Sequence, residues 1–497
     1  MIGDDYPEQL MQACAAYQRT VALVHIDTPP GTAREARLAE ALDQCTEVCT
    51  PSQLLALQSL IAAAPAVVQE PLRRLYAWGL DMQVQRAILP RQRTLQAHLR
   101  TTTCLVDEEP IPLLAGFSAM AGESRRDRRA AIEAAVGEQL EASHDLFAAR
   151  FEALRQIAAV LEYASLESLW ADIVLVDPAT LEDFVVRVLE ATQGVYIDLL
   201  AWAVKQRLGV PLGQLRRHDV LTLFSFAEYQ QYYQPGSLPP SLQASLHDMG
   251  LDPYADGRLV RRERAPEFGP PVALAVQIPD EVVLCYPNQT GGVQGVAAYA
   301  SAYGRALLWA YTSPDLPLVQ RLLGDAALLT SNAQLLAELI ASPRWLRHYM
   351  QISVDGDYWL WRRLDRLYRL RRQLGRFLYT RYVSTAESLV GAPDAYREIM
   401  MTACQVDYAP AYYLADWDWQ YASVAFCRGW YLAVVLIEAV RQQCGYDWFW
   451  NPDSGAWLRQ YWHGAFGSNL EALLQSLSGT SWEATLFADM LTQEDVW

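Results

Sequence analysis

The chain has 497 residues, which is too long for one ordinary hydrophobic core, so we expect two or three lobes. Hydrophobic residues make up 52% and charged residues 20%, a balance that is typical of a folded protein and excludes a disordered chain. The formal net charge of −17 argues against a partner that is a nucleic acid or an anionic membrane, because both repel an acidic surface.

The start of the chain and its cysteines predict a cytoplasmic protein. Residues Met1 to Gln12 are acidic and lack the basic, apolar character of a signal segment. The longest uninterrupted apolar run, Gly429 to Ile437, has nine residues and is too short to span a membrane. The eight cysteines are scattered, with one close pair at 45 and 49, as expected for free thiols in a reducing compartment.

Apolar residues at helical spacing predict a mostly α-helical fold. Thr50 to Gln53 combines an N-cap, a first-turn proline and a capping-box glutamine, and Asp177-Pro178 begins another helix that should end near Leu208. The two prolines between Val106 and Gly116 favour an extended crossing loop. The helices expected in this half are 4–20, 33–47, 52–64, 68–98, 119–163, 166–174 and 178–208.

One region departs from the helical pattern. The stretch Pro270 to Pro287 is rich in β-branched residues and is interrupted by proline, which predicts two short strands with Pro279-Asp280 at the turn. Asn288 to Gly292 reads as a turn, and a helix should follow from Val293 to Tyr311. The helices expected after it are 315–323, 327–341, 343–351, 356–383, 392–405, 419–443, 453–462 and 468–476.

The strand pair, the Gly-Gly turn and the helix containing Gly304, Ala306 and Leu307 together resemble the core of the thimet oligopeptidase and oligoendopeptidase F family of zinc metallopeptidases. In that family the helix bears His-Glu-x-Gly-His followed by Ala-Leu-His. Two histidines four residues apart share one helix face and bind one zinc ion, and the glutamate is the general base for a zinc-bound water. A glutamate from a later helix is the third protein ligand.

The resemblance implies that this chain has lost the zinc site. Ser301 and Arg305 stand in place of the two histidines, and Ala302 stands in place of the general base. Thr330, 25 residues after Arg305, stands in place of the glutamate ligand. We therefore expect no bound zinc and no catalytic residue, although zinc is the cofactor of the family.

Further stretches match the family in the same order, namely 214–219, 341–346, 413–416, 428–430 and 456–474. The resemblance implies a zincin-type fold with an N-terminal helical lobe at 1–210 and a catalytic-type lobe at 211–497. A small β-edge would lie beside the former active-site helix, and a deep central channel would run between the lobes. The candidate residues of a peptide channel are Arg305, Tyr303, Tyr421, Phe426 and Arg428.

A metal site elsewhere is not indicated, because none of the seven histidines pairs with another at ligand spacing. Glu338 lies eight residues after Thr330, about two helical turns away at roughly 1.5 Å per residue, and cannot replace the missing glutamate. Arg305 keeps a positive charge where the metal would lie, and it could bind a peptide carboxylate or carbonyl. The interpretation we favour is that it pairs with a neighbouring acidic side chain.

A second basic feature is one helix with eight arginines. Its apolar stripe, formed by Leu364, Leu367, Leu374 and Phe377, predicts an amphipathic helix with a solvated or salt-bridged face, and a partner-docking patch is the alternative. The arginines are at 362, 363, 366, 369, 371, 372, 376 and 381.

These observations favour a non-catalytic peptidase homologue that binds a peptide or a protein partner. Two alternatives stay open: a peptidase with an atypical metal site, and a structural subunit of a larger assembly. The oligomeric state is not predicted.

Overall fold

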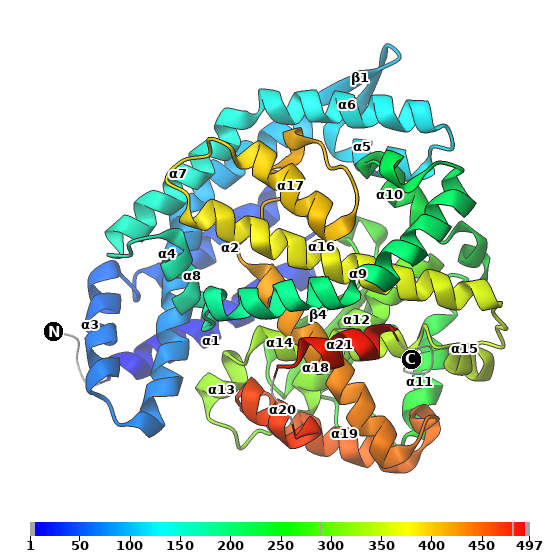
Figure 1. Cartoon of the computed structure of the whole chain (residues 1–497). Coiled ribbons are helices and arrows are strands. Elements are labelled where there is room, and N and C mark those ends of the chain that lie inside the picture. The colour runs from blue at the N-terminus through cyan, green and yellow to red at the C-terminus, as the bar shows by residue number, and fades with distance from the viewer. Residues whose placement is uncertain (1–4, 289, 480–481, 493–497) are drawn as a thin grey trace.

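The computed structural model of the chain describes residues 5–288, 290–479 and 482–492. Gln289 of the expected turn and the first four residues of the acidic start lie outside these ranges. Within them the protein is mostly α-helical, with twenty-one α-helices and two small β-sheets (Figure 1). The prediction of a mostly helical fold is therefore confirmed.

The first half of the chain is helical except for one hairpin. Its elements are α1 Tyr6–Asp27, α2 Thr32–Thr46, α3 Pro51–Ala63, α4 Ala66–Thr101, β1 Thr103–Val106, β2 Glu109–Pro112, α5 Leu113–Gly122, α6 Arg126–Ala142, α7 His144–Val160, α8 Leu166–Val174, α9 Pro178–Leu208, α10 Arg217–Leu223 and α11 Leu238–Asp248.

The second half holds the larger sheet and the remaining helices. Its elements are β3 Leu259–Arg264, β4 Val272–Gln277, β5 Glu281–Pro287, α12 Gly292–Tyr311, α13 Leu318–Leu322, α14 Ala326–Leu339, α15 Pro343–Tyr349, α16 Gly356–Thr385, α17 Ala392–Cys404, α18 Ala422–Cys444, α19 Pro452–Ala465, α20 Leu470–Ser478 and α21 Ala484–Thr492.

Local capping explains the helix boundaries that were predicted well. The backbone N–H of Thr50 donates to Oε1 of Gln53 at 2.9 Å, which completes the capping box of α3. The carboxylate of Asp177 accepts a hydrogen bond from the N–H of Ala179 at 3.0 Å, and α9 ends at Gly209 with φ 68°. A glycine in the left-handed region ends a helix at low steric cost, so α9 has the predicted bounds.

Two expectations between residues 98 and 163 were wrong. The stretch expected as a crossing loop forms an antiparallel hairpin, β1–β2, with its turn at Asp107 and Glu108, and then the start of α5. The single helix expected over 119–163 is three helices, because Glu123 is extended and Ser143, with ψ 7°, interrupts the helical backbone. Because apolar residues recur at helical spacing on both sides of each break, the sequence pattern alone did not reveal where the helices end.

The larger sheet has the strand order β3-β5-β4. β4 and β5 are antiparallel and joined at Pro279-Asp280, as predicted, whereas β3 pairs with β5 in parallel and was not anticipated. The parallel partner lies in a stretch of mixed charge, Leu259–Arg264, whose pattern is not that of a buried strand. β4 and β5 pack against α12, so the expected β-edge lies beside that helix.

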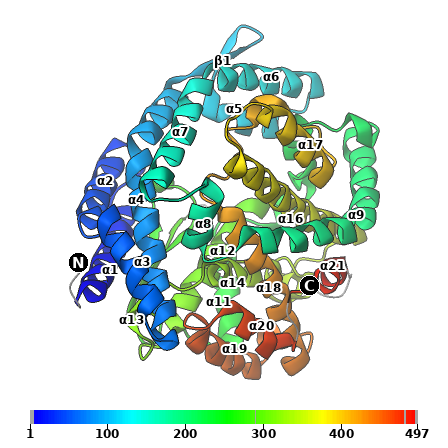
Figure 2. The same cartoon turned by 60° about the vertical axis from the view of Figure 1, so that its left-hand side comes forward.

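Most buried apolar side chains form one large cluster that extends from Tyr6 to Leu491, and a small second cluster lies between α1 and the strands β4 and β5. Helices α1 to α4 group on one side of the molecule, and α19 and α20 lie at its lower end in both views (Figures 1 and 2). α18 is long and apolar enough to cross a membrane by length and composition, and 83% of its apolar window is buried inside the protein. All eight cysteines lie in the described part of the chain as free thiols.

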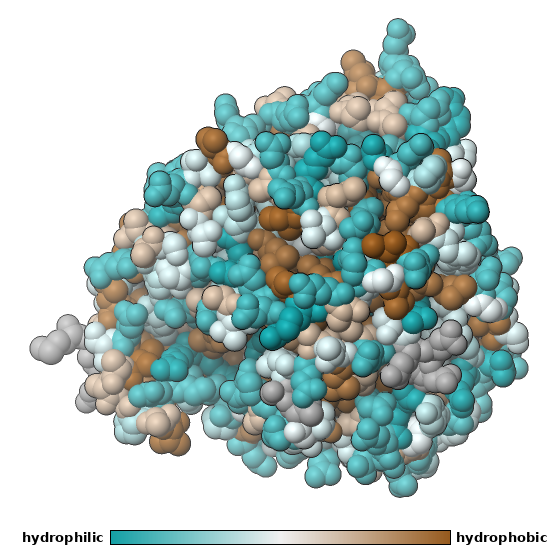
Figure 3. Space-filling view, viewed as in Figure 1, coloured by the Kyte–Doolittle hydropathy of each residue, from teal (hydrophilic) through white to brown (hydrophobic). Residues whose placement is uncertain are grey.

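Hydrophilic side chains cover most of the face shown in Figure 3, with apolar patches near its middle. The predicted lobe boundary at residue 210 falls just after α9. That helix packs against α16 and α21, both from the second predicted lobe.

Candidate ligand-binding site

Helix α12 packs against α14 at very close range. A Cβ atom added at Gly304 would lie 2.0 Å from the backbone oxygen of Asn332, which only a glycine avoids. The next helix pair is similar, because a Cβ atom added at Gly429 of α18 would lie 2.5 Å from Cβ of Thr330. Glycines therefore bring the backbones of α12, α14 and α18 together.

The positions that the sequence resemblance assigns to a zinc site hold residues that do not fit a metal. Ala302 is buried, and the hydroxyl of Thr330 donates to the backbone oxygen of Ala326 at 3.2 Å. Ser301, Ala302, Arg305 and Thr330 provide no thiolate, imidazole or carboxylate, the ligands that zinc prefers. Elsewhere in the described ranges no group of three or more histidine, cysteine or acidic side chains is arranged to hold a metal ion.

Arg305 is half-buried and has no ion-pair partner among the described residues. Among the residues that the structure describes, none lies within hydrogen-bonding or ion-pairing distance of its guanidinium group. Burial lowers the pKa of Arg305, and no neighbouring charge contributes to the shift. The favoured interpretation, a pairing with an acidic neighbour, is therefore wrong for the described residues.

Tyr303 belongs to a buried tyrosine cluster. Its hydroxyl shares a 2.6 Å hydrogen bond with that of Tyr254, and its ring stacks on Tyr299 with centroids 6.0 Å apart. Burial, the largest cause, raises the pKa of Tyr303 well above its usual value, so the phenol stays protonated. Its contacts are those of a core residue.

The other three channel candidates lie in different surroundings. Tyr421 is buried and its ring stacks on Trp170, with centroids 5.8 Å apart. Arg428 is also buried and forms a 2.9 Å ion pair with Asp325, the N-cap of α14. Phe426 lines a cavity of about 660 Å³ that Ser301 also lines. The structure thus brings Ser301 and Phe426 together, and places the other candidates outside the lining of this cavity.

This cavity is bounded by segments that are far apart in the sequence. Met120 of α5, Val220 of α10 and Ala297 of α12 contribute to its walls, together with a row of side chains from α16. The lining of α12 includes residues 294, 298 and 301, so Arg305 lies one turn beyond Ser301 on the same helix face. A volume of this size is typical of a small-ligand site.

Arginines dominate the charged part of the cavity lining. Arg217 of α10 and Arg362, Arg369 and Arg372 of α16 line it, with Asp365 as the one acidic lining residue. Three arginines of α16 that were expected on a solvated or salt-bridged face are buried, at 362, 366 and 371. Part of the arginine face of α16 is therefore directed into the protein, whereas Arg369 on the same helix is 40% exposed.

A buried ion cluster supports the cavity from behind. Glu338 of α14 accepts a 3.0 Å hydrogen bond from Arg366 and one of 3.4 Å from Arg362, and all three side chains are less than a tenth exposed. Burial alone would raise the pKa of Glu338, but Arg366 and Arg362 outweigh it and the pKa lies below its usual value. The salt-bridged interpretation of the arginine helix is correct for these two residues.

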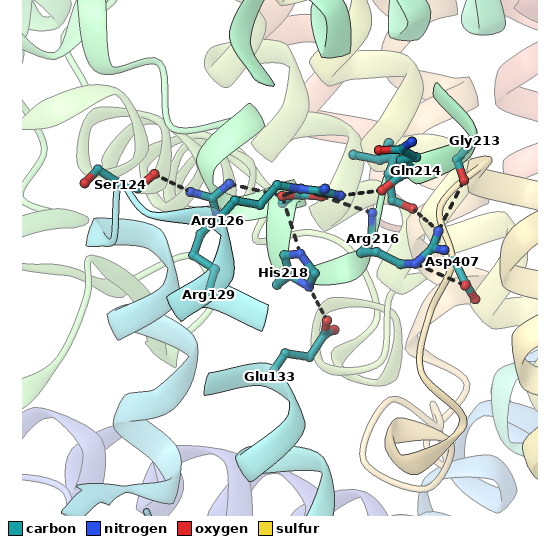
Figure 4. Close-up of polar contacts among 11 residues, drawn as sticks. Ser124, Arg126, Arg129, Glu133, Gly213, Gln214, Arg216, His218 and Asp407 are labelled. Carbon is teal, nitrogen blue, oxygen red and sulfur yellow. Dashed lines mark hydrogen bonds and ion pairs between the residues drawn. The ribbon is translucent and has the colours of Figure 1, made fainter. Parts of the chain in front are cut away.

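A second polar cluster, around His218, anchors α10 (Figure 4). Nδ1 of His218 lies 2.6 Å from Oε2 of Glu133 on α6. The adjacent Asp219 is fully buried and accepts hydrogen bonds from Arg126 and Arg129, both at 3.0 Å. Since the side chains of His218 and Asp219 anchor α10 to α6, the neighbouring Arg217 is held at the cavity wall.

The sequence carried one usable signal for this site. The arginines of α16 recur three or four residues apart beside an apolar stripe, in a chain of strong negative charge. This pattern indicates a helix face where positive charge is concentrated. Local periodicity could not show that this face turns inward, and nothing in the pattern around Arg217 connects it with α16.

No protein-family model matches this chain, and no curated protein matches it either. The class that the structure defines is a mostly α-helical protein with small sheets. Its fold is like that of a solved structure titled "BsuCP Crystal Structure", with a TM-score of 0.59 at 12% sequence identity and 98% of each chain covered. At that identity the likeness concerns the fold alone.

Proposed function

We propose that this protein is a non-catalytic relative of the zinc oligopeptidases and that it binds peptides. The proposal includes a zincin-type arrangement in which the cavity is the remnant of a channel between two lobes. One observation supports it most directly: Ser301, which stands in place of the first zinc-binding histidine, lines a cavity of about 660 Å³.

The composition of the cavity wall agrees with a position between lobes. Phe117 and Met120 belong to the predicted lobe 1–210, and the other lining residues belong to 211–497. Apolar and aromatic side chains share the wall with a few polar groups, which is the usual character of a ligand pocket.

Metal analysis and a cleavage assay test the non-catalytic part of the proposal. We expect purified protein to contain less than stoichiometric zinc and to leave a quenched-fluorescent peptide library intact, with or without added zinc. Stoichiometric zinc together with turnover would overturn the proposal in favour of a peptidase with an atypical metal site.

A matched pair of variants tests the binding part. Ala297→Trp would place an indole in the cavity from α12 and should abolish peptide binding, measured with a fluorescent peptide library. Ala191→Trp makes the same change on the exposed face of α9 and should leave binding unchanged. Both variants should keep the wild-type circular dichroism spectrum; equal binding by the two would contradict a site in the cavity.

A further inference from the structure

The positive charges around the cavity outnumber the negative ones. Four arginines line it, at 217, 362, 369 and 372, and the acidic side chains that pair with them among the described residues are Glu338, Asp365 and Asp416. Positive charge is therefore in excess at the wall, in a protein whose net charge is −17. Such a local reversal of sign favours an anionic ligand.

The excess is concentrated on three guanidinium groups with unused donors. Arg217, Arg369 and Arg372 make ion pairs at 3.9, 3.9 and 3.5 Å, which are too long for good hydrogen bonds. None of the three guanidinium groups donates a hydrogen bond to any residue within the described ranges. Each guanidinium carries five N–H groups, so donors remain for a ligand that accepts several bonds.

Arg217 and Arg372 share one carboxylate. Both pair with Oδ1 of Asp416, whose Oδ2 accepts a 2.6 Å hydrogen bond from Tyr396. Burial alone would raise the pKa of Asp416, but Arg217 and Arg372 outweigh it, and the pKa lies below its usual value. One ionised carboxylate is thus shared by two cations, and a second carboxylate would complete the pairing.

Aromatic rings occupy another part of the wall. The ring of Phe224 stacks on that of Tyr368 with centroids 4.4 Å apart, and Phe426 packs edge-on against Trp430. The three rings of Phe224, Tyr368 and Phe426 line the cavity with the arginines. An apolar or aromatic side chain that lies between negatively charged groups would satisfy both parts of the wall.

We propose that the cavity binds an acidic peptide segment, with two carboxylates that flank an apolar side chain. One carboxylate pairs with Arg369, and the other lies between Arg217 and Arg372. This assignment rests on the proposed peptide-binding function and names the chemistry of its ligand. Carboxylates of side chains and of a peptide C-terminus would be bound by the same guanidinium groups.

Short blocked peptides separate these possibilities by isothermal titration calorimetry. Ac-Asp-Phe-Asp-NH₂ should bind the wild-type chain with an affinity at least about tenfold higher than that of Ac-Asn-Phe-Asn-NH₂. Its affinity should fall as the salt concentration rises from 50 to 500 mM. The unblocked-end peptide Ac-Asn-Phe-Asn-OH reports the contribution of a C-terminal carboxylate, and it should bind between the two. Equal affinity for the acidic and amide peptides would overturn the assignment while leaving peptide binding intact.

Charge-removing variants locate the site. Arg369→Gln, in which the replaced side chain is 40% exposed, should fold normally and weaken Ac-Asp-Phe-Asp-NH₂ binding about tenfold or more. Arg372→Gln should do the same, and Arg187→Gln on the exposed face of α9 is the matched control and should have no effect. If Arg369→Gln and Arg187→Gln bind alike, the assignment is wrong.

Citrate distinguishes a failure of the assignment from a failure of the proposed function. We expect citrate to bind much more weakly than Ac-Asp-Phe-Asp-NH₂, because it lacks the apolar part. If citrate binds in an Arg369-dependent manner and neither peptide binds, the cavity is an anion site, and both the acidic-peptide assignment and the peptide-binding function are overturned.

Discussion

Two neighbouring regions around α12 use opposite kinds of packing. On one side, glycines let α12, α14 and α18 approach until backbone atoms touch, and no space remains. On the other side, α12 faces a cavity whose wall includes Arg217, Arg369 and Arg372, and the guanidinium groups of these three donate no hydrogen bond to a described residue. The two regions therefore differ in what they can do. The close packing of helices in the first region stabilises the fold, whereas the second region has the volume and the positive charge to accept a ligand.

The buried ion cluster between the two regions should give the largest effect. Glu338→Gln would leave Arg362 and Arg366 buried without a counter-charge and should lower the free energy of unfolding by about 4 kcal/mol. Urea denaturation measures the change. Glu109→Gln removes an exposed partner of Arg128 and should cost less than about 1 kcal/mol. Similar losses in both variants would mean that Glu338 is not a central support.

The glycine-packed region should be nearly as sensitive. Gly304→Ala would place a methyl group against the backbone of Asn332 and should destabilise the fold by about 3 kcal/mol, since neither helix backbone can yield without losing other contacts. Gly194→Ala in α9 meets no atom within 4 Å and should stabilise the protein by about 0.5–1 kcal/mol. A tolerated Gly304→Ala would show that the helices are not in backbone contact.

Acid should weaken the supports of the cavity before it affects the apolar packing. The pKa values of Glu338 and Asp416 are lowered in the folded protein, so their stabilisation is complete above the unfolded-state values of 4.5 and 3.8. It is then lost as the pH falls through the folded-state values. Urea midpoints between pH 6 and 3.5 should fall less steeply for Glu338→Gln than for wild type, and parallel curves would contradict the ionised state of Glu338.

Arg305 should show the smallest effect on stability. Because it has no acidic partner among the described residues, Arg305→Met removes a partly buried charge without breaking an ion pair, and the melting temperature should stay constant or rise slightly. The same variant, assayed for peptide binding, reports whether Arg305 extends the site beyond Ser301. A clear loss of stability would instead indicate that it supports the fold.

Local sequence determined much of this protein. Capping residues determined both ends of α9, and the proline-punctuated β-branched stretch determined the hairpin of β4 and β5. These features depend on residues within one or two turns of each other, which is the range over which a sequence pattern is informative. The sequence did not show that Gly304 lies at a close helix contact, because the partner backbone at Asn332 belongs to another helix.

Only the tertiary structure decided where the charges lie. Arg217 and Arg372 meet at Asp416 from separate segments, and Glu338 meets Arg362 and Arg366 across two helices. The same arginine pattern would suit a surface helix or an interior one, because helical periodicity shows which residues share a face and not what that face contacts. The cavity and the arginines of its wall follow from that long-range packing, and so does the position of Tyr303, Tyr421 and Arg428 outside the lining that contains Ser301.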